Sequence, residues 1–528
     1  MIKTDVTVAI GYTDSDIKDA ICQSLPVDRG EIRDIKILRR TLKLGERAEY
    51  ALTLGIAFSG EREAGLLKMK KKVFECPSYE LSVPTVKGAR PVVVGAGPAG
   101  LFAALLLAEA GLCPIVLERG DDIVKREEAR LRFHTLRTLD TESNVQFGEG
   151  GAGAFSDGKL KVGGMDKYKY KVLSEFVNAG APSDILYTVG AHLGTDKLPE
   201  LVKKIRERAV SLGATFMFRC RLTDIEVKEG RIIAAVYEKN GASESIPTDT
   251  LILAQGHSAR DTFSMLLSHG LAMESRPFGI GVRIEHPREY INKLIFGDPA
   301  LANDVGTASY HLVTHLSSGR SVYSFCMCPG GTVVAAASEE GGIVTNGMSE
   351  YMRDAENSNA AHLVSVFKSD FGSDHPLAGI ELQQKIEKAA FAIAGDYRAP
   401  VVRMEDFLTK SAPSSLGGVT PSYPLGTVMS APEEYLPEFI IESLRAGIYD
   451  FDNWKQGFIY PDAVLTGPET RSTSPVRIIR SESGESVSVA GLYPIGEGAG
   501  YAGGIVSSAA DGLRIAERII LSMVKNYN

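Results

Sequence analysis

The stretch that decides the fold is Pro91-Val92-Val93-Val94-Gly95-Ala96-Gly97-Pro98-Ala99-Gly100-Leu101. Its consecutive valines predict a short buried strand, and the apolar run Leu101–Ala110 predicts a helix directly after the glycine-rich turn. A second short strand is predicted at Pro114–Leu117, and the acidic residue Glu118 follows it. Strand, turn, helix and strand form a βαβ unit whose G-x-G-x-x-G turn is typical of dinucleotide-binding folds.

Each glycine of this turn has a separate physical task. Gly95 permits a tight turn, Gly97 lets the backbone approach a pyrophosphate, and Gly100 allows the helix to pack closely on the strand. Pro98 and Ala99 lie between them, where the amide groups and the dipole of the helix meet phosphate charge. Glu118 is expected to accept hydrogen bonds from the adenosine ribose hydroxyls.

The bare G-x-G-x-x-G string is weak evidence, because it recurs at Gly148–Gly153 and at Gly498–Gly503. Only the copy at Gly95–Gly100 follows an apolar strand, opens an apolar helix and precedes a strand that ends in an acidic residue. The alternative for this copy is an ordinary strand-turn-helix.

The end of the chain distinguishes FAD from other dinucleotides. A strand predicted at Ser488–Leu492 leads into Gly496-Glu497-Gly498-Ala499-Gly500, and a helix is predicted over Ser507–Met523. This arrangement resembles the second FAD segment of many flavoproteins, in which an acidic residue contacts the ribityl or phosphate portion and helix-end amides reach the flavin. Glu497 has the first position here, and the backbone of Gly504 and Ile505 has the second.

A third segment, Leu253-Ala254-Gln255-Gly256-His257, ends a buried strand with small residues and resembles the ATG motif of FAD enzymes. Together with Asn144–Leu160, Gly256–Asp261 and Tyr501–Ile505, it makes residues 90–525 resemble the bacterial FAD-dependent dehydrogenases of unassigned substrate. Those proteins are part of the wider glutathione-reductase-like flavoprotein superfamily.

The resemblance implies a set of FAD contacts. They are Gly95, Gly97, Gly100, Glu118, Arg119, Gly256, Gly496 and Glu497, with Arg126 near the phosphates and the Leu222 backbone at the adenine. Gly150, Gly151, Ser156 and Lys159 are expected beside the flavin or pyrophosphate, because the glycine-rich loop Gly148–Lys159 permits close backbone approach. The sequence departs from the family pattern at two positions: Gln255 stands where many relatives have Thr, and Glu497 where Asp is common. Both side chains can still form hydrogen bonds, so FAD binding is still expected.

The expected fold class is α/β: a Rossmann-like FAD-binding domain with an inserted α+β cap and a small N-terminal α+β domain. The predicted segments are 1–88 for the N-terminal module, 89–270 for the first part of the FAD domain, 271–465 for the cap and 466–528 for the closing part. The first part carries a glycine-rich insertion at 140–165. The region from Ala272 to Pro461 shows no pattern that dictates its fold or a reaction.

Composition narrows the function classes. A net charge of -8 among 528 residues gives no global attraction to nucleic acid or to anionic membranes. The basic cluster Lys68, Lys70, Lys71 and Lys72 allows a local nucleic-acid site, although a solvated face is favoured. No leader or membrane-spanning pattern is apparent, and the scattered cysteines fit a reducing cytoplasm. The close pair Cys326 and Cys328 is expected to pack in the core, with a redox or metal role as the alternative.

These observations predict an FAD-dependent oxidoreductase that transfers a hydride to or from a small-molecule substrate, with no metal and with NAD(P)H as a transient reductant. The candidate catalytic residues are Lys159, His257, Arg471 and Glu469, where Glu469 is expected to orient Arg471 toward a substrate carboxylate. Two alternatives stay open: a flavin-dependent RNA-modifying enzyme, and a sensor that holds FAD without turnover.

Overall fold

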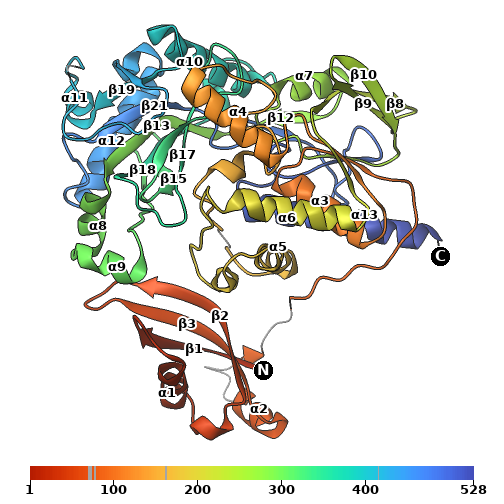
Figure 1. Cartoon of the computed structure of the whole chain (residues 1–528). Coiled ribbons are helices and arrows are strands. Elements are labelled where there is room, and N and C mark those ends of the chain that lie inside the picture. Colours follow the sequence, from red (N-terminus) through yellow and green to blue (C-terminus); the bar gives the residue numbers. More distant parts are fainter. Residues whose placement is uncertain (69–73, 76–78, 161–162, 414, 528) are drawn as a thin grey trace.

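The computed structural model describes residues 1–68, 74–75, 79–160, 163–413 and 415–527. Figure 1 shows a small N-terminal module below the rest of the molecule, which contains a parallel sheet with its helices and a larger antiparallel sheet. Within the described ranges, no helix has the length and apolar character needed to cross a membrane.

The N-terminal module is a four-stranded sheet in the order β2-β3-β1-β4 with two helices. Strand β1 alternates buried and exposed residues, so the buried side chains Ile2, Val6 and Val8 face the helix α1. The bounds are β1 Ile2–Ala9, α1 Asp14–Ser24, β2 Asp34–Lys43, β3 Glu49–Ala57, α2 Gly60–Leu67 and β4 Phe74–Glu75. Of the basic cluster, Lys70, Lys71 and Lys72 lie outside the described residues, as does Cys76.

The central sheet is parallel and has the order β23-β11-β5-β6-β7. In β5, Val93 packs with the helices on one face, whereas Val92 and Val94 pack with the meander on the other. Burial on both faces explains the unbroken apolar run in the sequence. The bounds of the strands are β5 Val92–Val94, β6 Ile115–Leu117, β7 Thr215–Met217, β11 Leu251–Leu253 and β23 Leu492–Pro494.

Helices cover one face of this sheet and an antiparallel meander covers the other. The helical layer consists of α3 Pro98–Glu109, α5 Lys167–Asn178, α6 Leu198–Ser211 and α13 Ile505–Tyr527. The meander has the order β10-β9-β8, with β8 Cys220–Lys228, β9 Arg231–Lys239 and β10 Ala242–Pro247. The helix α7 Arg260–Ser268 packs with it, while α4 Ile123–Leu136 precedes the glycine-rich loop.

The cap is built on a seven-stranded sheet with the order β14-β15-β18-β13-β21-β19-β20. Its long central strands β13 Phe278–Pro287 and β18 Asn357–Val366 are buried along nearly their whole length. The other strands are β14 Val313–His315, β15 Ser321–Cys328, β19 Ala399–Arg403, β20 Thr427–Met429 and β21 Val464–Glu469. The helices are α8 Arg288–Phe296, α9 Ala302–Val305, α10 Ala378–Ala394, α11 Met404–Thr409 and α12 Glu438–Trp454.

Two short antiparallel pairs and several single turns complete the fold. The pairs are β12 Met273–Ser275 with β22 Val476–Ile478, and β16 Thr332–Ala335 with β17 Thr345–Met348. The 3-10 turns are Arg29–Glu31, Ala152–Phe155, Ser183–Leu186, Pro299–Leu301, Lys368–Asp370 and Pro432–Glu434.

The expected α/β fold class is confirmed, but the final strand was predicted wrongly. The sequence favoured Ser488–Leu492, whereas the strand is β23, Leu492–Pro494. Gly491 has a φ of +79°, so the chain turns just before the strand begins, and Ser486 and Ser488 are tied by a local hydrogen bond instead of a sheet ladder.

Candidate functional site

One long cavity runs across the carboxyl ends of β5, β6 and β11 and continues to the cap sheet. Its nucleotide-binding end is lined by residues that directly follow these strands, among them Gly95, Glu118 and Gly256. Its far end is lined by cap residues, including Cys326 of β15 and Glu469 of β21. Ligands of open α/β sheets bind at this edge of the strands.

The glycine turn leaves no room for side chains. Gly95 has a φ of +99°, and a Cβ there would collide with the carbonyl oxygen of Ala254. A Cβ at Gly100 would collide with the carbonyl oxygen of Gly95, which explains the close packing of α3 on the strand. Because α3 begins at Pro98, its first amide groups have no partner within the helix and lie at the cavity wall.

Glu118 lies at the cavity wall and is almost fully buried. Its carboxylate accepts backbone N–H groups from Ala96 at 2.7 Å, from Gly120 at 2.8 Å and from Gly148 at 3.0 Å. The same side chain therefore ties the glycine turn after β5 to the glycine-rich loop that starts at Gly148. The sequence pattern predicted that Glu118 lies at the site, but it did not predict that Glu118 links the two glycine-rich segments.

Arg119 also lines the cavity, as does Leu222. Its guanidinium pairs with Glu142 at 3.1 Å and with Asp261 at 2.9 Å, and lies 4.1 Å from the ring centroid of Phe147. These contacts fix the position of the guanidinium at the cavity wall.

The glycine-rich loop is shaped from behind by Arg126, which is fully buried. The Arg126 guanidinium donates hydrogen bonds to the carbonyl groups of Asn144, Val145, Glu149 and Gly151 at 2.6 to 2.9 Å. Arg126 therefore shapes the loop from behind: its donors are used by the loop backbone, and it is not among the cavity-lining residues. Its expected place near the phosphates stays a prediction.

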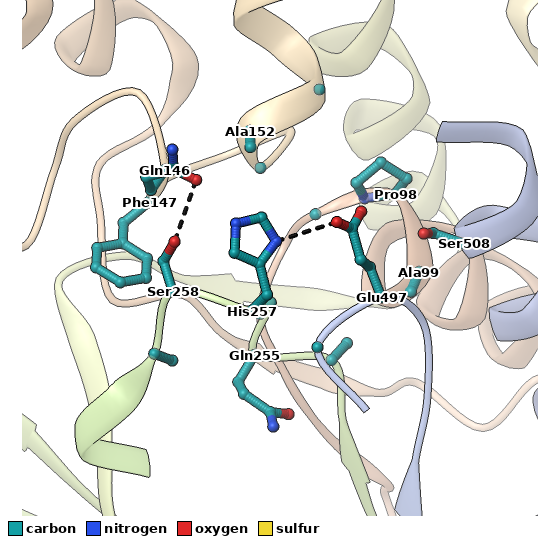
Figure 2. Close-up of a pocket in the computed structure, with 18 of the residues that line it drawn as sticks. Pro98, Ala99, Gln146, Phe147, Ala152, Gln255, His257, Ser258, Glu497 and Ser508 are labelled. Atoms are coloured by element: carbon teal, nitrogen blue, oxygen red, sulfur yellow. Dashed lines mark hydrogen bonds and ion pairs between the residues drawn. The ribbon is translucent and has the colours of Figure 1, made fainter. Parts of the chain in front are cut away.

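His257 and Glu497 both line the cavity and contact each other directly, as Figure 2 shows. Their Nδ1 and Oε1 atoms are 3.1 Å apart, and the buried Nε2 of His257 has no partner among the described residues. Gln255 is also buried, and neither its side-chain oxygen nor its nitrogen has a described partner. Unsatisfied polar atoms at a cavity wall indicate a polar ligand.

The helix α13 starts at this cavity, with Gly504 and Ile505 in its lining. A Cβ at Gly153 would lie 2.9 Å from the Ile505 side chain, so the glycine-rich loop passes directly against the start of α13. The free amide groups at the start of a helix favour negative charge.

The far end of the cavity gathers charged and polar side chains of the cap. Arg283 of β13 is fully buried and pairs with Glu469 through two contacts at 2.6 and 3.0 Å. Burial raises the pKa of Glu469 to about 7, against the opposing charge of Arg283. Lys159 donates to the carbonyl of Met327, and burial lowers the pKa of Lys159 below its usual value.

Arg471 lines the same end, but the prediction that Glu469 orients it is wrong. Its guanidinium contacts Glu387 at 3.0 and 3.1 Å and donates to the hydroxyl groups of Ser258 and Ser338. Glu469 is instead the partner of Arg283. Because Glu387 occupies the Nε and one Nη atom of Arg471, this guanidinium is not free to bind a substrate carboxylate through two parallel hydrogen bonds.

Most of the predicted site residues lie together at this cavity. The lining includes Gly95, Gly97, Pro98, Ala99, Glu118, Arg119, Gly151, Ser156, Lys159, Leu222, Ala254, Gly256, His257, Glu469, Arg471, Glu497, Gly504 and Ile505. Four predicted residues stand behind the wall instead: Gly100, Arg126, Gly150 and Gly496. A Cβ at Gly496 would lie 2.7 Å from the Cβ of Ala99, so this glycine serves helix packing.

Sequence reasoning assigned no role to several lining residues, namely Gln146, Phe147, Cys220, Arg221, Ser258, Thr262, Phe325, Asn346 and Ser472, and it expected Cys326 to pack in the core, whereas Cys326 lines the cavity. Asn346 carries no local motif: it lies on β17, which pairs with β16, and its side chain accepts a hydrogen bond from Arg283 at 3.1 Å. Within the described ranges, no group of three or more His, Cys, Asp or Glu side chains is arranged to hold a metal ion.

These features fit FAD. The backbone from Gly95 to Gly100 leaves space for a pyrophosphate. Gln255 and His257 have buried polar atoms without a partner among the described residues, and FAD could supply those partners. The amide groups at the start of α13 could bind the part of FAD beyond the phosphates. The cavity continues past this point to Cys326 and Glu469 of the cap.

Comparisons with known proteins agree with this fit. Residues 89–149 match the family model of an FAD binding domain, and residues 277–472 match that of FAD-dependent protein, C-terminal domain-like. An uncharacterized protein of Clostridium beijerinckii is 44% identical over 514 residues, which are 96% of this chain and 95% of that protein.

Solved flavoproteins are more distant. A flavoprotein/dehydrogenase from Cytophaga hutchinsonii is 12% identical with a TM-score of 0.35, covering 83% of this chain and 79% of that one. The glycerol-3-phosphate dehydrogenase from Bacillus halodurans complexed with FAD is 11% identical with a TM-score of 0.34, covering 84% and 66%. A flavin-dependent brominase is 12% identical with a TM-score of 0.37, covering 83% and 79%.

The predicted family and cofactor are confirmed by the two family models and the nearly full-length relative. The chain belongs to this family of FAD-dependent flavoproteins, and FAD is its cofactor.

Proposed function

We propose that this flavoprotein is an oxidoreductase that transfers a hydride between FAD and a small-molecule substrate bound beneath the cap. The observation that carries this proposal is the single cavity that joins the nucleotide-binding elements to Lys159, Glu469 and Arg471. A sensor that only stores FAD has no need for a buried, titratable carboxyl group at the far end of its cavity.

The chain's own residues divide the cavity into a cofactor part and a substrate part. The first amides of α3 would hold the pyrophosphate, Glu118 and Leu222 the adenosine side, and Gly504 and Ile505 the flavin edge. The substrate part would lie between the glycine-rich loop and β21. When bound, FAD supplies the two-electron hydride chemistry.

Glu469 is the best candidate for moving a proton at the substrate. Its pKa, raised by burial to about 7, makes both protonation states available near neutral pH. A protonated Glu469 can donate to a substrate oxygen or carbon in the reducing direction, and an ionised Glu469 can accept a proton in the oxidising direction. Arg283 holds the carboxyl group in place through its two contacts.

The test is anaerobic. Purified protein is reduced with NADH, NADPH or dithionite and then mixed with quinones, unsaturated carbonyl compounds or 2-oxo acids while the visible absorbance of the flavin is followed. We expect at least one class to reoxidise the flavin, with a rate that falls as the pH rises through about 7, because the proton donor is then lost.

Glu469→Gln should retain FAD but slow this reoxidation by roughly 100-fold or more, and its rate should lose the pH dependence near 7. Asp370→Asn is the matched control, since Asp370 also pairs with an arginine through two contacts, at 2.7 and 2.8 Å to Arg320, away from the cavity lining. If no donor reduces the flavin and no acceptor reoxidises it, the protein is a sensor and the proposal fails.

A further inference from the structure

Two cysteines lie at the cap end of the cavity, and the mechanism above does not use them. Cys326 lines the cavity and is partly exposed, whereas Cys328 is fully buried behind it. Both belong to β15 and flank Met327, whose side chain is buried on the opposite side with Ile291 and Ala360.

The strand is distorted where the two cysteines lie. Cys326 has a φ of +42°, and the pairing of β15 with β18 shifts register between Phe325 and Cys328. In a regular strand, residues two apart have Cα atoms roughly 6.6 Å apart, close to the upper limit of about 6.8 Å for a disulfide. Here the Cys328 Sγ lies 3.2 Å from the Cys326 carbonyl oxygen, and the two thiols are hydrogen-bonded to each other, so both sulfur atoms lie on the same side of the bulge. Backbone strain of this kind is retained where a site requires it.

The surroundings favour a thiolate. Arg283 donates to the Cys326 carbonyl at 3.1 Å and lies 3.8 Å from the Cys328 sulfur. Lys159 reaches the carbonyl of Met327, between the two cysteines. The carboxylates facing this point are both paired: Glu469 with Arg283, and Asp157 with Arg353.

The Cys328 thiol donates a hydrogen bond to Cys326 and thereby lowers the pKa of Cys326 to about 6. Burial opposes this shift, whereas the positive charges of Arg283 and Lys159 add to it. The same hydrogen bond and burial raise the pKa of Cys328 well above its usual value. One thiolate and one neighbouring thiol are the two groups that disulfide formation needs.

We propose that Cys326 and Cys328 are a redox-active dithiol that exchanges two electrons with the bound FAD, giving the protein a second two-electron centre. In the oxidising direction the Cys326 thiolate and the Cys328 thiol form an S–S bond, and the Cys328 proton is released. The two electrons pass to FAD together with that proton and one proton from solvent. Reduced FAD returns the same electrons and protons to the disulfide.

The location supports FAD as the electron partner. The loop that carries Lys159 also carries Gly153, which passes against Ile505 at the start of α13. The cysteines thus border the loop that would cover the flavin, at the same end of the same cavity. This inference rests on the proposed function in one respect: it takes from it the position of the flavin ring at the end of the cavity that borders the cap.

The first measurement counts reducing equivalents. Air-oxidised holoprotein is titrated anaerobically with dithionite, and the flavin absorbance and the free thiols are followed together. We expect two electron pairs per FAD for the wild type and one for Cys326→Ser or Cys328→Ser. Cys22→Ser is the matched control and should keep two, because Cys22 lies on α1 of the N-terminal module and is not among the cavity-lining residues.

The second measurement does not depend on the variants folding or on turnover. Wild-type protein, either reduced or oxidised, is treated with iodoacetamide and digested with a protease. The mass of the peptide that contains both cysteines is then measured by mass spectrometry. We expect alkylation only after reduction, with a rate that rises with pH around a midpoint of about 6. A peptide lighter by two hydrogens in the oxidised sample identifies the disulfide.

The proposal is overturned if the wild type takes up one electron pair per FAD, or if both cysteines alkylate equally in the oxidised and reduced protein. Either result leaves the proposed function intact as long as an acceptor reoxidises the flavin. Conversely, a count of two electron pairs in a protein that no acceptor reoxidises supports the dithiol and contradicts the proposed function.

Discussion

Glu387 is buried between two arginines and joins the cap to the FAD-binding part of the molecule. Its carboxylate contacts Arg260 of α7 at 2.9 Å and Arg471 at 3.0 Å, and it accepts the Thr470 hydroxyl at 2.7 Å. Although burial acts to raise it, these two guanidinium groups hold the pKa of Glu387 well below its usual value. One carboxylate therefore compensates two buried cations.

We predict that Glu387→Gln lowers stability by about 3–5 kcal/mol, because removing one partner leaves buried charge uncompensated. The apparent Tm should fall by roughly 10 °C for a domain of the cap's size. Because the folded-state pKa of Glu387 is depressed, its contribution is present above the unfolded-state value and is lost as the pH falls toward the folded-state value.

Thermal unfolding at neutral pH checks this prediction. Glu339→Gln is the control, since Glu339 also contacts Arg260 but its side chain is 35% exposed. The control should change stability by less than about 1 kcal/mol. Equal Tm values for the wild type and Glu387→Gln would show that the network contributes nothing to stability.

Single residues were predictable where their partners are close in sequence. The tasks of Gly95 and Gly100, and the position of Glu118, follow from the strand, turn and helix around them. Arg471 and Glu387 are 84 positions apart, and no periodicity links them. The choice of Arg283 over Arg471 as the partner of Glu469 depends on the pairing of β13 with β21, which only the folded chain specifies.

At the scale of elements, the crossing of α13 over α3 fixes the floor of the cofactor site. A Cβ at Gly512 would collide with the carbonyl oxygen of Ala99, at the start of α3. The helices therefore touch through backbone at this point, directly behind the glycine turn. This contact sets how far the first amides of α3 project into the cavity.

We predict that Gly512→Ala pushes α13 away from α3, lowering both stability and the amount of FAD that co-purifies. Overpacking of this kind costs about 1–3 kcal/mol. Gly65→Ala in α2 is the matched control, because a Cβ there meets nothing within 4 Å and alanine favours a helix by about 1 kcal/mol. The flavin-to-protein absorbance ratio and the Tm measure the two effects, and an unchanged ratio in Gly512→Ala would refute the prediction.

Elements with strong local patterns were predicted closely, and those without were not. Apolar residues recur on one side of Leu198–Leu212 and predict a helix, which is α6, Leu198–Ser211. Two alternating runs separated by Glu229-Gly230 predict a hairpin, which β8 and β9 form. The terminal helix is longer than expected, Ile505–Tyr527. The cap strands escaped prediction because β13 and β18 are buried on both faces, which removes the alternation that marks a strand.

At the scale of the whole molecule, the N-terminal module has a hydrophobic core of its own. It meets the rest of the chain through polar contacts of β2: the Arg40 guanidinium pairs with Asp184 at 2.8 Å, and the Arg40 amide donates to the Tyr187 carbonyl at 2.7 Å. The boundaries 1–88, 89–270, 271–465 and 466–528 stay predictions. So does the absence of a nucleic-acid partner, since most of the basic cluster lies outside the described residues.

We predict that a chain beginning at residue 79 folds and retains FAD at the same flavin-to-protein ratio as the full chain, because its cavity has no lining residue from the module. Removing residues 505–527 is the contrasting control and should abolish FAD binding, since α13 lines the cavity and packs on α3. A colourless or insoluble chain beginning at residue 79 would show that the module is needed for the fold.

The position of β23 in the sequence has a consequence for synthesis of the protein. It pairs with β11, yet the entire cap is translated between the two strands, and α13 follows only at the very end. Until β23 and α13 have been synthesised, the β11 edge of the parallel sheet is unpaired, and Glu497 and Ile505 are absent from the cavity. A chain that stops within the cap therefore lacks β23 and α13, and with them the cavity-lining residues Glu497 and Ile505.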